Sequence, residues 1–236
     1  MQFESPLVPA RLERRYKRFL ADVVLEDGSA VTVHCPNTGS MMGVAEPGSR
    51  VWLLHRPSPT RKYAWGWELS ELADGTLVGV NTHRSNALVA EAIAAARFPV
   101  LAGYRDVIPE SKYGTENSRI DLLLRGPERP DCYVEVKNVT AAVTDGIALF
   151  PDAVSERGAK HLRELMGVVA AGGRAVLVFC VQRTDVREVR PADAIDPVYG
   201  RTLREAIARG VEVVAWRADL SRTAATLTTS LPVVCP

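Results

Sequence analysis

The sequence predicts an α/β protein (α+β overall) made of two units, a small β-barrel over residues 1–84 and a mixed-sheet unit over residues 85–236. Two observations carry this prediction. Up to about residue 80, short apolar runs alternate with turn residues, a pattern typical of strands. From residue 84 onward, longer segments with apolar residues at helical spacing alternate with strand-like runs, which indicates helices packed on a sheet.

The N-terminal unit has the pattern of five short strands. They are predicted over Tyr16–Leu25, Ala30–His34, Arg50–His55, Ala64–Leu72 and Leu77–Val80. The pairs Asp27-Gly28 and Asp74-Gly75 predict hairpin turns, because such pairs accept the positive φ that tight turns require. Five short strands suit a small barrel, for which an OB-fold is the natural candidate and an SH3-like barrel the alternative.

The second unit alternates helices and strands. It begins with a helix over Asn86–Arg97 that Pro99 stops. A strand pair, two helices and two further strands follow, predicted over Arg119–Leu124, Cys132–Val139, Ser155–Ala171 (helix), Ala175–Val181, Pro197–Ala208 (helix) and Val211–Trp216. The almost unbroken apolar run of residues 175–181 is typical of a strand buried on both faces. This order indicates an α/β sandwich around a mixed sheet.

Composition narrows the class of protein. Hydrophobic residues make up 47% and charged residues 24%, as in ordinary globular proteins. The net charge of +1 does not point to a nucleic-acid partner, so such a prediction rests on local clusters. Four cysteines without CxxC spacing predict free thiols in a reducing compartment. Without a signal-peptide pattern or an apolar run near ~20 residues, the sequence predicts a cytoplasmic protein with no membrane partner.

The segment from Asp121 to Lys137 carries the most informative chemistry. In an extended chain, residues i and i+2 share a face, so Glu135 and Lys137 point together. The turn over residues 125–130 brings Asp121 beside them, which predicts Asp121, Glu135 and Lys137 as catalytic residues. Two carboxylates and the carbonyl of Val136 suit a hard cation such as Mg²⁺ or Mn²⁺, with Lys137 positioning the attacking water. The alternative is an ordinary charge pair on a solvated strand face.

This grouping resembles the PD-(D/E)xK nuclease superfamily, whose core is a restriction-endonuclease-like αβββαβ fold with a mixed sheet. One departure is that Asp121 follows Ile120 instead of a proline. In that superfamily a third acidic ligand often comes from upstream, and Glu91, Glu110 or Glu116 is a candidate here. Glu116 is favoured as a metal ligand because it lies in the polar segment entering the strand; solvated loop charge is the alternative.

A closer resemblance covers nearly the whole chain. Segments that resemble the sugar fermentation stimulation protein A (SfsA) family are Tyr16–Asp22, His34–Met41, Lys112–Gly114, Ser118–Asp121, Pro130–Lys137, Phe150–Val154, Glu156–Gly158 and Lys160–Leu165. This resemblance implies an OB-like domain followed by a nuclease-like domain, DNA binding, and a link to the regulation of sugar, notably maltose, metabolism. It does not settle whether members of the family cut nucleic acid.

Three clusters of cations predict a nucleic-acid surface. The residues are Arg14, Arg15, Lys17, Arg18, Arg61, Lys62, Tyr63, Trp65, Arg157, Lys160 and His161. Backbone-tracking cations with aromatic platforms suit a single strand, whereas duplex DNA uses the cations for phosphates; RNA also fits. The alternatives are that Trp65 and Trp67 face the barrel core, and that the helix at residues 156–163 presents a solvated, salt-bridged face.

Two functional hypotheses follow from these residues. The first is a DNA-binding protein whose Mg²⁺- or Mn²⁺-dependent site hydrolyses phosphodiester bonds. The second is a non-catalytic DNA-binding transcriptional regulator that keeps the nuclease fold. A sugar-metabolising enzyme has little support, because the chain has no phosphate-cradling glycine loop and no dinucleotide-binding fingerprint.

Overall fold

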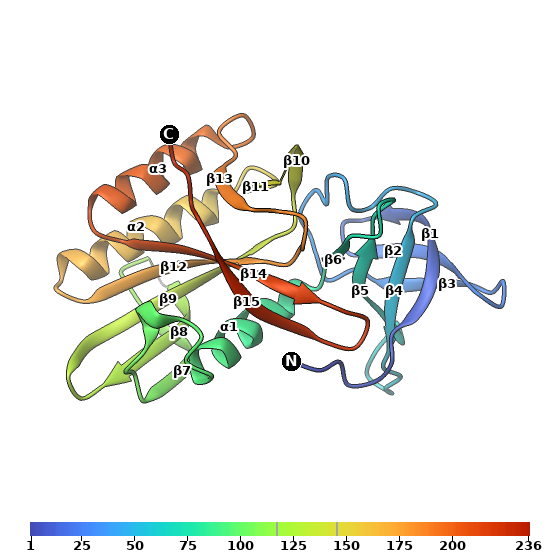
Figure 1. Cartoon of the computed structure of the whole chain (residues 1–236), viewed down its shortest axis with the longest axis horizontal. Helices are drawn as coiled ribbons and strands as arrows, with labels where there is room; N and C mark the ends of the chain where they lie inside the picture. Colours follow the sequence, from blue (N-terminus) through green and yellow to red (C-terminus); the bar gives the residue numbers. More distant parts are fainter. Residues whose placement is uncertain (117, 145) are drawn as a thin grey trace.

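The computed structural model describes residues 1–116, 118–144 and 146–236, and Figure 1 shows its barrel on the right. The barrel strands are β1 (Val8–Tyr16), β2 (Leu20–Leu25), β3 (Ala30–His34), β4 (Arg50–His55), β5 (Trp65–Glu71) and β6 (Leu77–Gly79). Their order is β3-β2-β1-β4-β5-β6, and an additional β3–β5 pairing closes the first five strands. Trp67 is fully buried at the centre of the barrel core.

The start of the barrel differs from the prediction. The predicted strand Tyr16–Leu25 contains a turn, because Lys17 and Arg18 have φ values of 50° and 64°. Strand β1 before this turn was not predicted, since its charged residues alternate with only a few buried ones such as Leu12. The predicted turns at Gly28 and Gly75 are confirmed, with φ values of 84° and 86°.

The second unit is built on a mixed six-stranded sheet of order β15-β14-β12-β9-β8-β7. Its strands are β7 (Asp106–Tyr113), β8 (Ser118–Gly126), β9 (Arg129–Val139), β12 (Arg174–Val181), β14 (Glu212–Leu220) and β15 (Ala225–Leu231). Strands β9, β12 and β14 are parallel, while β7, β8 and β15 pair antiparallel. A small sheet adds β10 (Ala142–Thr144), β11 (Ile147–Phe150) and β13 (Glu188–Pro191). Strands β7, β10, β11, β13 and β15 were not predicted.

Helices cover both faces of the large sheet. Helix α1 (Ser85–Ala94) packs on one face, and α2 (Glu156–Ala170) and α3 (Pro197–Ala208) pack on the other, as Figure 1 shows. Two short 3-10 helices, η1 (Thr82–Arg84) and η2 (Pro99–Leu101), flank α1. Helix α2 begins after Ser155, which caps the helix because its hydroxyl accepts a hydrogen bond from the Gly158 backbone N–H. The predicted sandwich is therefore present.

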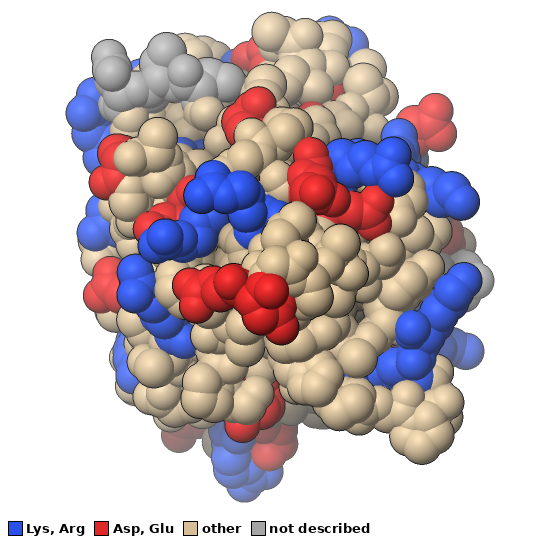
Figure 2. Space-filling view, turned by 90° about the vertical axis from the view of Figure 1, so that its right-hand side faces the viewer, with Lys and Arg blue, Asp and Glu red and all other residues tan. Residues whose placement is uncertain are grey.

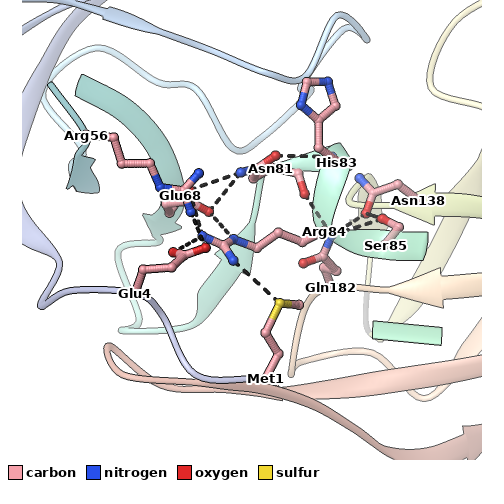
Figure 3. A network of polar contacts seen from close by, with 10 residues as sticks. All are labelled: Met1, Glu4, Arg56, Glu68, Asn81, His83, Arg84, Ser85, Asn138 and Gln182. Carbon is pink, nitrogen blue, oxygen red and sulfur yellow. Dashed lines mark hydrogen bonds and ion pairs between the residues drawn. The ribbon is translucent and has the colours of Figure 1, made fainter. Parts of the chain in front are cut away.

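The barrel and the second unit meet in a buried polar network, drawn in Figure 3. Arg84 at the end of η1 donates Nε and Nη2 to the two carboxylate oxygens of Glu68 on β5, at 2.6 and 3.1 Å. The next residue, Ser85, donates to Asn138 Oδ1 at 3.0 Å, just beyond Lys137 on β9. Gln182, after β12, donates to the same oxygen at 2.6 Å. One short segment thus holds both units together.

Glu4 provides a pH-dependent part of this network. Burial alone raises the pKa of Glu4, but hydrogen bonds from Arg56 and Arg84 outweigh it and lower the pKa from 4.5 to about 2. Its contribution to stability is therefore present above pH 4.5 and is lost as the pH falls towards about 2. We expect the stability difference between the wild type and Glu4→Gln in urea unfolding to shrink over that window. A difference that stays constant with pH would contradict this assignment.

Candidate metal centre and nucleic-acid surface

Asp121 lies where β8 begins to leave β9. The ladder between these strands runs through Leu122↔Val134, and Asp121 is the next residue outward. Its Oδ2 accepts a hydrogen bond from the Val136 backbone N–H at 2.7 Å, and its Oδ1 accepts one from the Asn86 amide on α1 at 2.8 Å. The Asp121 carboxylate is therefore held between two strands and the first turn of α1.

Glu135 occupies the buried centre of the site. Its side chain is only 3% exposed, and Lys137 Nζ donates to its Oε1 at 2.7 Å. His161 Nδ1 on α2 contacts the same oxygen. The other carboxylate oxygen, Oε2, is buried without a hydrogen-bond partner among the described residues. A carboxylate oxygen without a partner in the protein interior is costly, so it is a natural place for a ligand.

The charge of Glu135 influences the pKa of Asp121. Burial raises the pKa of Asp121, and the negative charge of Glu135 raises it further. Burial alone also raises the pKa of Glu135, but the hydrogen bond from His161 and the charge of Lys137 lower it below its usual value. Asp121 thus carries a charge that the protein leaves poorly compensated. A cation placed between Asp121 and Glu135 relieves the repulsion between their negative charges.

His161 and Arg157 form the outer edge of this centre. Arg157 Nε donates to His161 Nε2 at 3.2 Å, so the ring nitrogen Nε2 is an acceptor. The ring proton then lies on Nδ1 and points to Glu135. His161 is buried, so the prediction that it reaches nucleic acid directly gains no support from this position. It orients Glu135 instead.

Glu116 lies apart from the two carboxylates. It sits in the turn between β7 and β8, 43% exposed, with Oε2 3.4 Å from Arg163. Lys160, the remaining predicted contact on α2, donates to the Glu116 carbonyl. No group of three or more His, Cys, Asp or Glu that suits a metal is found in residues 1–116, 118–144 and 146–236. The observed acidic pair is therefore Asp121 and Glu135.

Glu164 is a buried carboxylate that the sequence did not single out. It accepts hydrogen bonds from the backbone N–H groups of Thr115 at 3.0 Å and Glu116 at 2.5 Å. Gly114 allows this approach, because it has a φ of 72° and any Cβ there would overlap the Glu164 carboxylate. Gly114 is a sequence feature that indicates a turn, but the residue that contacts this turn lies 50 positions downstream on α2 (164 − 114) and cannot be identified from local spacing. Glu164 therefore fixes the turn.

The predicted cations at the start of the barrel have different roles. Arg14 Nε donates to Asp22 Oδ2 at 2.9 Å and is 71% exposed. Arg15 Nη2 donates to the carbonyl oxygens of Arg18, Asn37 and Gly39 at 2.7–2.8 Å, so it stabilises the loops around the barrel. Lys17 and Arg18 form the exposed turn between β1 and β2. Arg14, Lys17 and Arg18 are thus accessible to a ligand, whereas Arg15 is engaged by the loops.

Arg61, Lys62, Tyr63 and Trp65 come together in one pocket, as the prediction requires for a common binding surface. Trp65 is half-buried and its ring lies 4.2 Å from that of His55, whereas Trp67 is fully buried. The alternative of a core position therefore holds for Trp67 and in part for Trp65, which packs against the barrel core while lining the pocket. Figure 2 shows the end of the molecule that carries the barrel, where Lys and Arg are interspersed with Asp and Glu. That face has no broad area in which all the charges have the same sign.

Comparison with known proteins identifies the family. A family model described as "SfsA N-terminal OB domain" matches residues 14–80, and one described as "Sugar fermentation stimulation protein RE domain" matches residues 83–224. The chain belongs to the SfsA family. The predicted fold class, an OB-like barrel followed by a restriction-endonuclease-like domain, is confirmed.

Members of the SfsA family align with the chain over its length. A sugar fermentation stimulation protein homolog from Alkalilimnicola ehrlichii is 57% identical over 100% of both chains. Another, from Thioalkalivibrio sulfidiphilus, is 62% identical over 91% of this chain and 90% of its own. The structure of Pyrococcus furiosus SfsA in complex with Ca²⁺ has a TM-score of 0.89 and 26% identity, covering 99% of this chain and 98% of that one.

One further observation concerns membranes. Across the described residues, no helix has the length and apolar character needed to span a bilayer.

Proposed function

We propose that this protein binds nucleic acid and hydrolyses its phosphodiester bonds with a divalent cation held by Asp121 and Glu135. The observation that carries the proposal is the buried Glu135 carboxylate, whose Oε2 has no partner among the described residues and which lies close enough to Asp121 to raise its pKa. Two neighbouring carboxylates without a full set of donors fit a hard cation, which binds oxygen ligands and keeps several waters.

The ligand set consists of the two carboxylates and the backbone carbonyl of Val136. The structure of SfsA from Pyrococcus furiosus is a complex with Ca²⁺, a cation that takes oxygen ligands, and this supports a divalent-cation site here. We propose Mg²⁺ or Mn²⁺ as the working ion. Glu116 is left out of the set, because its carboxylate faces Arg163.

The remaining residues act on the substrate and on the carboxylates. A bound divalent cation stabilises the charge that develops on the phosphate oxygens. The Lys137 ammonium lies on the same strand face as Glu135 and is partly accessible, so it can orient a water or a phosphate oxygen. His161 holds Glu135 through its Nδ1 proton, and Arg157 fixes the ring that carries this proton. Asn86 holds Asp121.

One observation favours a second function, a DNA-binding regulator without turnover. In the structure the charge of Glu135 is compensated by the Lys137 ammonium, and His161 contacts the same oxygen, so a cation is not needed to neutralise that carboxylate. The names of the relatives refer to sugar fermentation, and regulation of sugar metabolism, such as that of maltose, would be the output of this binding.

A cleavage assay separates the two functions. Wild-type protein is incubated with single-stranded DNA, duplex DNA and RNA in Mg²⁺ or Mn²⁺, alongside Asp121→Asn and Glu135→Gln. The matched control is Asp131→Asn on β9, a residue whose side chain is 41% exposed and paired with Arg125 at 3.1 Å. We expect cleavage by the wild type and the control, and a loss of about 100-fold or more in both site variants. Binding without cleavage in every variant would favour the regulator and contradict the nuclease.

A further inference from the structure

Two neighbouring cavities include barrel residues, and the second also includes residues of the second unit. The first, which we call the barrel pocket, has a volume of about 340 Å³ and is lined by His34, Arg61, Lys62, Tyr63, Trp65 and His83 among others. Its lining combines cations and aromatic rings with one acidic residue, Glu68, which is paired with Arg84. Arg61 and Lys62 are exposed, and neither has an acidic partner within ion-pair distance among the described residues. Both are therefore free to meet a phosphate.

The second cavity, which we call the interdomain cleft, has a volume of about 300 Å³. Barrel residues such as Arg18 and Asn37 form one wall, and Asn138, Phe150 and Ser155 of the second unit belong to the other. Arg18 is exposed and makes no ion pair in the part of the chain that the structure describes. The cleft thus also offers a cation, polar side chains and an aromatic ring, together with the carboxylate of Asp152, which accepts hydrogen bonds from Ser40 and the Met41 backbone.

The two cavities share their dividing wall. The segment of residues 34–39 contributes His34 and Pro36 to the barrel pocket and its last three residues to the interdomain cleft. In the segment of residues 81–83, Asn81 and His83 line the barrel pocket, whereas Thr82 lines the interdomain cleft. Thr82 Oγ1 donates to the Pro36 carbonyl at 2.8 Å and ties the two segments together. A chain-like ligand crossing this wall would occupy both cavities.

The interdomain cleft lies near the carboxylate centre along the chain, although none of the described residues that line the cleft belongs to that centre. It lies at the carboxyl end of β9, where Asn138 follows Lys137 directly, and it includes the N-cap residue of α2, the helix that carries Arg157 and His161. In open α/β sheets, ligands bind beyond the carboxyl ends of parallel strands. Asn138 is itself fixed by Ser85 and Gln182, as Figure 3 shows. The part of the cleft that Asn138 forms is therefore held in place by two hydrogen bonds.

We propose that a single nucleic-acid strand runs through the barrel pocket and the interdomain cleft to the Asp121–Glu135 centre, so that single strands are the preferred substrate. This inference rests on the proposed function, because that function makes the Asp121–Glu135 centre the place where the strand ends. Small cavities with aromatic rings and unpaired cations fit splayed-out bases and a tracked backbone. A duplex instead needs a broad basic surface for its phosphates, and the barrel face in Figure 2 mixes both signs of charge.

The test measures binding of labelled deoxythymidylate of about 12 nucleotides, a length within the site size of such barrels, by fluorescence anisotropy. Binding of a duplex and of an oligouridylate of the same length is measured in parallel, in EDTA and in Ca²⁺. Arg61→Ala and Tyr63→Ala probe the barrel pocket, and Arg18→Gln probes the interdomain cleft. Arg50→Ala on β4, an exposed cation outside both cavities, is the matched control. Circular dichroism verifies that each variant folds.

We expect single-stranded DNA or RNA to bind more tightly than duplex, with Tyr63→Ala weakening binding about tenfold and each cation variant weakening it more than Arg50→Ala. Duplex binding equal to or tighter than single-strand binding would overturn the proposal. So would a cleft variant that behaves like the control. Ca²⁺ binding without nucleic acid is measured separately, so failure of the metal centre is distinguished from failure of the strand path.

Discussion

Replacing Glu68 with alanine is expected to lower the free energy of unfolding by about 3–5 kcal/mol, because it leaves the buried Arg84 guanidinium with only the exposed Glu4 as a carboxylate partner. Glu68 and Arg84 are 3% and 8% exposed, and their bidentate contact joins β5 of the barrel to the start of α1. Asn81 also donates to both Glu68 oxygens at 3.0 Å. Urea unfolding at neutral pH measures the loss.

Two further variants show whether the unpaired buried charge causes the loss of stability in Glu68→Ala. Glu205→Ala on α3 removes an exposed ion pair with Arg209, the residue that follows the helix, and we expect a change of about 0.5 kcal/mol or less. The double variant Glu68→Met with Arg84→Met removes both charges and should recover much of the loss, since an apolar pair leaves no ion unpaired. A double variant as unstable as Glu68→Ala would contradict the assignment.

The second large effect concerns Asp121. Because burial and Glu135 raise its pKa, the charged carboxylate is unfavourable in the folded protein without a cation. We expect Asp121→Asn to unfold at a higher temperature than the wild type in EDTA. In saturating Ca²⁺ the order should reverse, because only the wild type gains binding energy, about 2.7 kcal/mol at a hundred times the dissociation constant. Thermal unfolding in both buffers provides the measurement.

Asp131→Asn is the control for this experiment, since it removes an exposed carboxylate of the same sheet. It should follow the wild type in both buffers. A lower unfolding temperature for Asp121→Asn in EDTA would show that Asp121 is a structural acceptor for Val136 and Asn86, and not a group strained by its surroundings.

The sequence was most informative where local spacing determines position. Glu135 and Lys137 share a strand face because they are two residues apart, and a short turn returns the chain to Asp121. The turns at Gly28 and Gly75 and the N-cap at Ser155 are likewise local features, and all are present. The long helices and the buried strand of residues 174–181 followed from periodicity.

What the sequence did not predict depends on contacts between distant segments. Glu68 with Arg84, and Asn86 with Asp121, are ordinary polar residues until the fold brings them together. Strand β7 was missed because Pro109 interrupts its pattern and Glu110 has a φ of 52°. Strands β10, β11 and β13 are three or four residues long, too short to show a period. Tertiary pairing defines such elements.

Calorimetric titration with Ca²⁺ in the absence of nucleic acid tests the central claim most directly. Wild type, Glu135→Gln, Asp121→Asn and Asp131→Asn are compared at the same pH. We expect saturable binding by the wild type and Asp131→Asn, and a loss of affinity of about 100-fold or more in the other two variants, since each removes a charged ligand. Unchanged affinity in Glu135→Gln and Asp121→Asn, or no binding by the wild type, would contradict a metal centre at these residues.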